Sequence, residues 1–213
     1  MSATPIRTAV YIDGFNLYYG AVRNTPHKWL DLRRVAELVA PHGHLIALIK
    51  YFTAHVKPTL RDPGVGQRQK SYLTALQAYR PEIKFIYGRF TIGEATVEPF
   101  DQTLPPRVHG RKPSEKGTDV NLAVHLLHDA WLDQYDAALV ISNDTDLEEA
   151  IRLVRADCGK KVGLVPPISN GRKVSHRLIT ATDFQRELRT ATLAVAQLPN
   201  PIPGTNLHKP ATW

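Results

Sequence analysis

Blocks of apolar and polar residues alternate along the chain in a way that predicts strands and helices in turn. Short continuous apolar runs are typical of buried strands, and apolar residues three or four positions apart are typical of amphipathic helices. By these criteria strands are expected at residues 8–12, 44–53, 83–90, 137–142 and 161–166, and helices at 32–40, 67–79, 118–131, 143–157 and 183–189. This alternation predicts an α/β fold whose central, mostly parallel sheet is covered by helices on both faces.

Local signals refine this pattern. Thr118 has the residue type of an N-cap, and Thr145 with Glu148 has the spacing of a capping box. The pattern is less regular between the third strand and the helix that begins at Thr118. There, residues 91–100 fit a hairpin or a strand excursion, and residues 103–116 are expected to form a basic, proline-rich loop.

The length of 213 residues suits one well-buried domain and is short for two. We expect residues 1–190 to form that domain and residues 191–213 to form a proline-containing tail. Exposed apolar residues of the tail, such as Ile202 and Trp213, would suit a contact between two copies of the chain, which leaves a homodimer open. No run approaches the roughly 18 apolar residues of a membrane span, and the start lacks the apolar core of a secretory signal. The expected location is the cytoplasm, with no membrane partner.

Charge and cysteine content narrow the classes of function. The formal net charge is +7 and the sequence pI is about 9.6, so the surface should on average attract polyanions such as nucleic acids. A single cysteine, Cys158, excludes an internal disulfide and a cysteine-based zinc site, and it agrees with a reducing compartment. No GxxxxGK[ST] phosphate loop is present, and Gly64 with Gly66 lacks the third glycine and the preceding strand of a dinucleotide site.

Acidic residues gather at the predicted ends of strands. Asp13 directly follows the first strand, and Asp144 and Asp146 come just after the fourth. Asp119 opens a helix that leads into this fourth strand through a short turn, so the start of that helix should lie at the same edge of the sheet. Because sites in α/β proteins form beyond the carboxyl ends of the strands, we expect the four carboxylates to converge there.

These acids predict a metal site with a specific preference. Oxygen ligands without histidine or cysteine favour hard cations such as Mg²⁺ or Mn²⁺, which can activate a water and stabilise the leaving oxygen of a phosphodiester. Without a metal, the four carboxylates would repel one another. Each acid also has a structural interpretation, since Asp119, Asp144 and Asp146 suit helix starts and Asp13 suits a hydrogen-bonded strand end. The residues alone leave both interpretations open.

Basic residues precede Asp119 in the predicted loop. Arg107, Arg111, Lys112 and Lys116 are expected to bind a phosphate backbone that enters the acidic site, with Lys116 nearest the scissile phosphate. A solvated charged loop is the alternative.

Three weaker patterns are better explained without a functional role. His125 and His128 have the spacing of a metal pair but are expected to face solvent, and Cys158 is expected to serve packing. Asp144 and Asp146 also form a DxD sequence, which occurs in many glycosyltransferases, but the chain is short for that fold.

Three segments, at residues 11–20, 115–127 and 135–165, together resemble the NYN domain family, the bacterial LabA-like branch of the PIN-like nuclease superfamily. The resemblance extends along nearly the whole chain. It implies a three-layer α/β/α PIN-like fold with a central parallel sheet, and a metal-dependent ribonuclease activity.

Compared position by position, the resemblance implies a set of site residues. Asn16 would orient Asp13 or a metal-bound water, and Lys116 and Ser142 match positions that flank the second and third motifs of the family. Asp183 also matches a family position, although a cap of the last helix is the favoured interpretation. The metal ligands implied by the resemblance are Asp13, Asp119, Asp144 and Asp146.

The predicted function is therefore hydrolysis of RNA phosphodiester bonds with Mg²⁺ or Mn²⁺ as cofactor and single-stranded or structured RNA as partner. Water would attack the phosphodiester and leave a 5′-phosphate and a 3′-hydroxyl. Two alternatives stay open: a non-catalytic module that binds RNA or a protein partner, and a phosphatase or DNA nuclease that uses the same acids. The expected catalytic residues are Asp13, Asn16, Asp119, Asp144 and Asp146.

Overall fold

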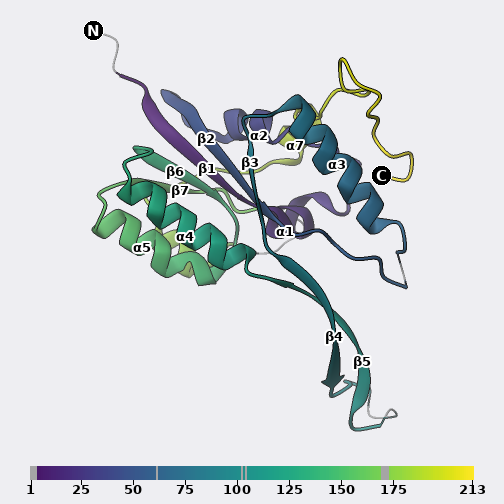
Figure 1. Ribbon diagram of the computed structural model, residues 1–213. Helices are drawn as coiled ribbons and strands as arrows, with labels where there is room; N and C mark the ends of the chain where they lie inside the picture. The colour runs from purple at the N-terminus through teal and green to yellow at the C-terminus, as the bar shows by residue number, and fades with distance from the viewer. Residues whose placement is uncertain (1–3, 61, 102, 104, 169–172) are drawn as a thin grey trace.

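The centre of the molecule is a six-stranded sheet in which all neighbouring strands are parallel. It is seen in a computed structural model that describes residues 4–60, 62–101, 103, 105–168 and 173–213. The strand order is β3-β2-β1-β6-β7-β8 (Figure 1). The strands are β1 (Ile6–Asp13), β2 (His44–Thr53), β3 (Lys84–Tyr87), β6 (Ala137–Ile141), β7 (Lys161–Leu164) and β8 (Phe184–Gln185). The predicted α/β class with a mostly parallel sheet is confirmed.

Helices cover both faces of this sheet and complete a three-layer arrangement (Figure 1). One face carries α1 (Gly14–Leu17), the π-helical turn η1 (Tyr18–Val22), α2 (Leu32–Val39), α3 (Val65–Tyr79) and α7 (Thr190–Val195). The other face carries α4 (Thr118–Trp131), the 3₁₀ turn η2 (Thr145–Leu147), α5 (Glu148–Ala156) and α6 (His176–Ala181). Among the described residues, none of these helices has the length and apolarity needed to cross a membrane.

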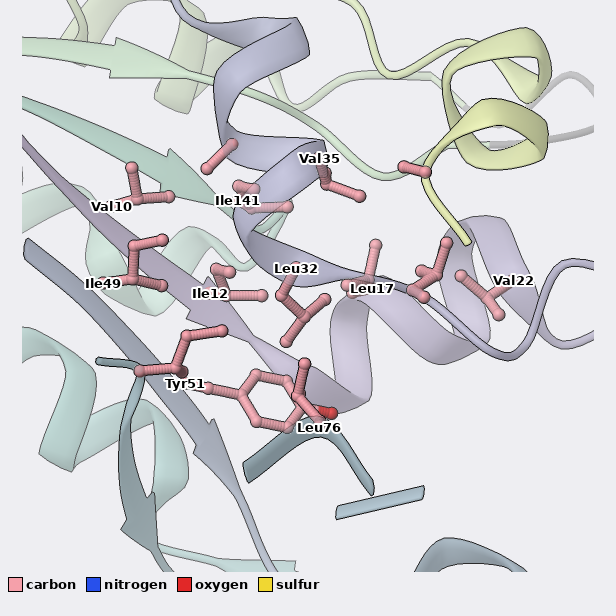
Figure 2. Packing of buried hydrophobic residues seen from close by; sticks show 14 of the residues in the cluster. Val10, Ile12, Leu17, Val22, Leu32, Val35, Ile49, Tyr51, Leu76 and Ile141 are labelled. Carbon is pink, nitrogen blue, oxygen red and sulfur yellow. The ribbon is translucent and has the colours of Figure 1, made fainter. Parts of the chain in front are cut away.

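The side chains of β1 show why its sequence is continuously apolar. Successive residues of a strand point to opposite faces, and both faces of this central strand are covered by helices. Val10 and Ile12 pack in one core with Leu32 of α2 and Leu76 of α3 (Figure 2). Ala9 and Tyr11 pack on the opposite side, beneath α4 and α5. All four side chains are fully buried.

Strands β4 (Arg89–Val97) and β5 (Val108–Lys116) form a separate antiparallel hairpin, here called the arm, which projects from the domain (Figure 1). The hairpin interpretation of residues 91–100 is confirmed, but the loop expected at residues 103–116 is wrong over 108–116, which pair with β4 along its whole length. Pro113 is tolerated because both strands of this ribbon are edges, where a missing N–H breaks no central ladder.

The predicted third strand, at residues 83–90, is divided in two by Gly88. Gly88 separates β3 in the main sheet from β4 in the arm. A Cβ atom at Gly88 would lie only 2.7 Å from the carbonyl oxygen of Lys116, so glycine permits the close approach of the two ends of the arm.

The helix expected at residues 183–189 is wrong. Phe184–Gln185 instead form β8, and the preceding Asp183 N–H donates a hydrogen bond to the carbonyl of Val162. The ring of Phe184 lies where a Cβ atom of Gly163 would be, which docks this segment against β7. Asp183 therefore does not cap a helix. Its carboxylate accepts hydrogen bonds from Arg155, Lys161 and the backbone N–H of Val162.

The tail after α7 lies on the domain, and its large apolar residues are not free surface. Ile202 is only 1% exposed, and Trp213 packs edge-on against Trp29 and Tyr72. The prediction that Ile202 is exposed is therefore wrong, and Trp213 is partly buried. Both side chains serve packing within one chain.

Candidate metal centre

The predicted acids lie beside β1, where the order in which strands are added to the sheet changes direction. From β1 the chain continues outward through β2 and β3, and it later returns to add β6 on the other side of β1. Ligands of open α/β sheets bind in the crevice at such a switch point, beyond the carboxyl ends of the strands. Asp13 is the last residue of β1, and Asp144 follows the end of β6.

Asp13 is held firmly and is only 7% exposed. One carboxylate oxygen caps α1 by accepting the backbone N–H of Asn16 at 2.9 Å, and the other accepts the hydroxyl of Ser142 at 3.0 Å. Burial raises the pKa of Asp13 to about 6; the two hydrogen bonds act against this shift, and the nearby charges of Asp144 and Glu115 add to it.

The next residue, Gly14, allows the chain to turn sharply from β1 into α1. A Cβ atom there would lie 2.7 Å from the carbonyl oxygen of Phe52 and 2.8 Å from the ring of Tyr51. Any side chain would push α1 away from β2 and move the Asp13 carboxylate with it.

Three other acids form a cluster beside Asp13. Carboxylate oxygens of Asp119, Asp144 and Asp146 all lie within 4.8 Å of one another. Asp119 is in the first turn of α4, while Asp144 caps η2 by accepting the backbone N–H of Asp146 at 3.1 Å. This cap replaces the predicted capping box, so the cap assigned to Thr145 is wrong.

Ser142 connects the buried acid to this cluster. Its hydroxyl donates to Asp13 and accepts the backbone N–H of Asp144 at 3.1 Å. Four acids were expected to converge, and the structure separates them into a cluster of three and a single neighbouring acid. Asp119, Asp144 and Asp146 could hold one ion together, whereas Asp13 lies outside that group and is coupled to it through Ser142 and through charge.

Asn16 holds the loop that follows β6. Its side-chain oxygen accepts the backbone N–H of Asn143 at 3.1 Å. It contacts Asp13 through its backbone N–H and not through its amide group. Asn143 in turn donates to the carbonyl of Lys173 and accepts from the N–H of Ser175, which ties this loop to the start of α6.

The donor set fits a hard divalent cation. In the described part of the chain, none of the four acids forms an ion pair with a lysine, arginine or histidine. Three carboxylates that approach one another without a cation repel, and carboxylate oxygens without histidine or cysteine are the ligands that Mg²⁺ and Mn²⁺ prefer.

Glu115 is a further acid near this centre that the sequence analysis missed. It lies at the end of β5, its charge contributes to the raised pKa of Asp13, and one of its oxygens accepts the N–H of Thr118 at 2.9 Å. The N-cap of α4 is Gly117, so the expected cap at Thr118 is wrong. Glu115 precedes Thr118 by three residues, a spacing that could have drawn attention to it among the surrounding basic residues.

The predicted phosphate-binding residues lie along the arm. Lys116 is at its base, three residues before Asp119, and is exposed. Lys112 and Arg111 are farther out on β5, and five residues of strand span about 17 Å. Arg107 precedes β5 and is exposed. The fold therefore places Lys116 at the base of the arm, three residues before Asp119, and it places the other three basic residues on an extension that a long polymer could follow.

A second ionisable group lies beneath α4, away from the cluster. The Asp129 carboxylate accepts the hydroxyl of Tyr11 at 2.7 Å and pairs with the ammonium of Lys50 at 2.6 Å. Lys50 also donates to Nδ1 of His125 at 3.0 Å. His128 is exposed, but the expectation that His125 faces solvent is wrong; burial and the Lys50 charge lower the pKa of His125.

A pocket opens on the other side of α1. Its walls are largely aromatic, and its volume is about 90 Å³. Gly14, the residue after Asp13, contributes to the wall, so the pocket begins one residue from the candidate centre. The aromatic residues that line it are Phe15, Tyr18, Tyr19, Tyr51, Tyr72 and Trp213.

Comparisons with known proteins agree with this architecture. The NYN domain model matches residues 7–187 of the chain. The 6-hydroxy-3-succinoylpyridine 3-monooxygenase HspA of Pseudomonas putida is 35% identical across all of this chain and 77% of its own. The low amplitude and bright protein LabA of Synechococcus elongatus is 28% identical over 90% of this chain and 83% of its own. These matches confirm the resemblance that was drawn from three segments of the sequence.

A solved structure supports the fold independently. A protein of unknown function from Vibrio parahaemolyticus superposes with a TM-score of 0.55 at 16% identity, over 89% of this chain and 97% of that one. At this identity the likeness concerns the fold alone.

Proposed function

Since this chain belongs to the NYN domain family, whose domains are nuclease-like and PIN-like, we propose that it is a metal-dependent ribonuclease. The observation that carries this proposal is the cluster of Asp119, Asp144 and Asp146 at the switch point of the sheet. Carboxylates that approach one another and have no cationic partner in the described chain suit a site that completes itself with Mg²⁺ or Mn²⁺.

Each residue has a role in this proposal. Asp119, Asp144 and Asp146 hold the ion, and Asp13 fixes Ser142, which in turn positions the backbone of Asp144. A divalent cation, when bound, supplies charge neutralisation at the phosphate and activation of a water. The water attacks phosphorus and the bond to the 3′ oxygen breaks, which leaves a 5′-phosphate and a 3′-hydroxyl.

The arm supplies the contacts to the polymer. In this proposal Lys116 binds the phosphate nearest the acids, and Arg107, Arg111 and Lys112, exposed along the arm, bind phosphates farther along the strand. A polymer fits this arrangement better than a mononucleotide, because these basic residues extend well beyond the acidic cluster.

Cleavage of labelled single-stranded RNA and DNA in Mg²⁺, Mn²⁺ or EDTA tests this proposal. The wild type should cleave RNA only with metal, and Asp144→Asn should lower the rate by about a thousandfold, which corresponds to about 4 kcal/mol. Asp157→Asn is the matched control, because it removes the same charge from an exposed site at the end of α5.

The possible failures of this experiment are distinct. Equal cleavage by wild type and Asp144→Asn would contradict the proposal, because the observed activity would then not depend on the acidic cluster. RNA binding that EDTA does not disturb, with no cleavage under any condition, would favour the alternative of a non-catalytic binding module.

A second candidate function is the conversion of a small heteroaromatic compound. It is suggested by the name of the Pseudomonas relative and favoured by the aromatic pocket beside Gly14. Calorimetric titration with 6-hydroxy-3-succinoylpyridine tests it. Saturable binding by wild type that is lost when Val65 at the pocket wall is enlarged to phenylalanine would support this candidate, and no binding would reject it.

A further inference from the structure

The aromatic pocket has the composition of a site for a flat ring. Six of its lining residues are aromatic, and the wall contains one charged residue, Lys28. Gln69 also lines it, but both ends of its amide are already used, in hydrogen bonds with the backbone of Ala54 and Val56. The lining is mainly aromatic and aliphatic, so the pocket suits stacking and apolar contact more than hydrogen-bond readout.

A row of stacked, at least partly exposed rings connects this pocket to the base of the arm. The rings of Tyr19 and Phe15 lie 6.4 Å apart at 15°, and those of Phe15 and Phe90 lie 6.3 Å apart at 16°. Phe90 belongs to β4, next to Arg89, which pairs with Lys116. The guanidinium group of Arg23 lies over the ring of Tyr19, 5.4 Å from its centroid.

The exposure of this row indicates a binding surface. Tyr19 is 51% exposed, and Phe15 and Phe90 are partly exposed, although large apolar side chains of this kind normally gain free energy by burial. Aromatic rings beside a basic groove are the usual platform on which bases of single-stranded nucleic acids stack, because every base has a π-face.

We propose that the pocket between α1 and α3 binds one base of the RNA strand whose phosphate lies at the candidate metal centre. This inference rests on the proposed ribonuclease function. The strand follows the arm, its bases stack along Phe90, Phe15 and Tyr19, and one base enters the pocket past Tyr19. Lys28 at the pocket is then placed to contact the phosphate of that nucleotide.

The size of the pocket favours a small base. A dry protein cavity of about 150 Å³ holds a whole benzene ring. At about 90 Å³ the present pocket is smaller, so a base would enter it by one edge. A pyrimidine should therefore bind more tightly than a purine.

The test measures RNA binding without catalysis. Fluorescence anisotropy of a labelled oligouridine in EDTA is compared for wild type, Val65→Phe, which fills the pocket, and Tyr19→Ala, which removes an exposed ring. Both variants should bind about tenfold more weakly, in line with the loss of one stacked base. Trp131→Ala is the control, since Trp131 is 78% exposed at the far end of α4 and should leave binding unchanged.

The base itself is probed with the RNA. An oligouridine whose abasic position occupies the pocket should bind wild type about tenfold more weakly than intact oligouridine does. The same abasic change should not weaken binding to Val65→Phe any further. An oligoadenosine should be less sensitive to Val65→Phe than oligouridine is. Thermal melting of each variant shows whether the fold is kept, and Tyr19→Ala provides the test if Val65→Phe does not fold.

The outcomes separate this inference from the proposed function. If both pocket variants bind and cleave RNA as wild type does, the base site is rejected and the ribonuclease stands. If wild type neither binds nor cleaves RNA, both are rejected. If a hydroxypyridine that carries a carboxylate binds wild type but not Val65→Phe, while oligouridine binding is unaffected, the pocket holds a small heteroaromatic compound and the base site is again rejected.

Discussion

Asp119 and Asp129 lie near the two ends of the same helix, α4, in opposite surroundings. Asp129 is buried and has two partners of its own, the ammonium of Lys50 at 2.6 Å and the hydroxyl of Tyr11 at 2.7 Å. Asp119 is partly exposed, and the charged groups clustered with it are two further carboxylates, Asp144 and Asp146. At one end of α4 a lysine of the same chain neutralises the carboxylate, and at the other end three carboxylates lie close together.

This difference separates a stabilising charge from a functional one. A buried carboxylate with a lysine and a hydroxyl has its desolvation cost offset, and removing it would leave Lys50 buried without its counter-ion. A group of carboxylates without a cation lowers stability through repulsion and gains it back when a ligand binds. The comparison therefore predicts that acids at the two ends of α4 respond in opposite ways to substitution and to metal.

The largest expected effect is at the neutralised end. Asp129→Ala should lower the free energy of unfolding by about 3–5 kcal/mol, because it leaves the Lys50 ammonium buried and unpaired. Urea unfolding followed by circular dichroism measures this. Lys50→Met combined with Asp129→Leu is the companion variant, and it should be less destabilised than Asp129→Ala because no buried charge is left. Equal stability of Asp129→Ala and wild type would mean that Asp129 and Lys50 are not a stabilising pair.

The next effect concerns metal at the other end. A hundredfold excess of Mn²⁺ over its dissociation constant should stabilise wild type by about 2.7 kcal/mol. Since a kcal/mol shifts the melting temperature of a domain of this size by about 2–4 °C, the shift should be about 5–10 °C. Asp144→Asn should lose most of this rise in melting temperature. Asp129→Ala should show the full rise, although its melting temperature without metal is lower than that of wild type. An equal shift in Asp144→Asn would place the bound ion elsewhere.

The sequence alone was enough to predict the central strands, because β1, β2, β6 and β7 are apolar runs between two layers of helices. It was not enough for β5, since Pro113, Gly110 and the charged residues of this strand resemble a loop until their pairing with β4 is seen. Nor was it enough for β8, whose two residues are too few to show any periodicity.

The same distinction applies to the acids. The predicted strand ends and the predicted start of the helix at Thr118 placed Asp13, Asp119, Asp144 and Asp146 at one edge of the sheet, because backbone topology alone determines where parallel strands end. The Ser142 bridge to Asp13, and the approach of Glu115, depend on side-chain positions from separate parts of the chain. The pair of Lys50 and Asp129 was missed for this reason too, since each residue alone fits an exposed position on its own element.

Asp183 offers a smaller test with a pH dependence. Burial acts to raise its pKa, but hydrogen bonds from the Val162 N–H, Arg155 and Lys161 outweigh this and lower the pKa below the ordinary 3.8. The unfolded chain therefore takes up the proton first, so this stabilisation is present above about pH 4 and is lost as the pH falls through the folded-state pKa. Asp183→Asn should cost about 1–2 kcal/mol at pH 7 in urea unfolding.

The difference between Asp183→Asn and wild type should then shrink as the pH is lowered toward 3. Asp157→Asn, which removes an exposed charge, should match wild type at both pH values. A cost that stays constant from pH 7 to pH 3 would show that the Asp183 carboxylate stabilises through shape and hydrogen bonding, without its charge.

The smallest expected effect is the most direct test of the comparison. Asp119→Asn in EDTA removes a negative charge from the first turn of α4, which costs about 0.3–1 kcal/mol of favourable helix-dipole interaction. It also removes repulsion from Asp144 and Asp146, which acts in the other direction, and asparagine keeps an oxygen that can accept the N–H of Val120. The net change in the free energy of unfolding should stay within about 0.5 kcal/mol. If Asp119→Asn instead destabilised the metal-free protein as strongly as Asp129→Ala, the acids at this end would be structural, and the case for a metal centre would fail together with the contrast between the two ends of α4.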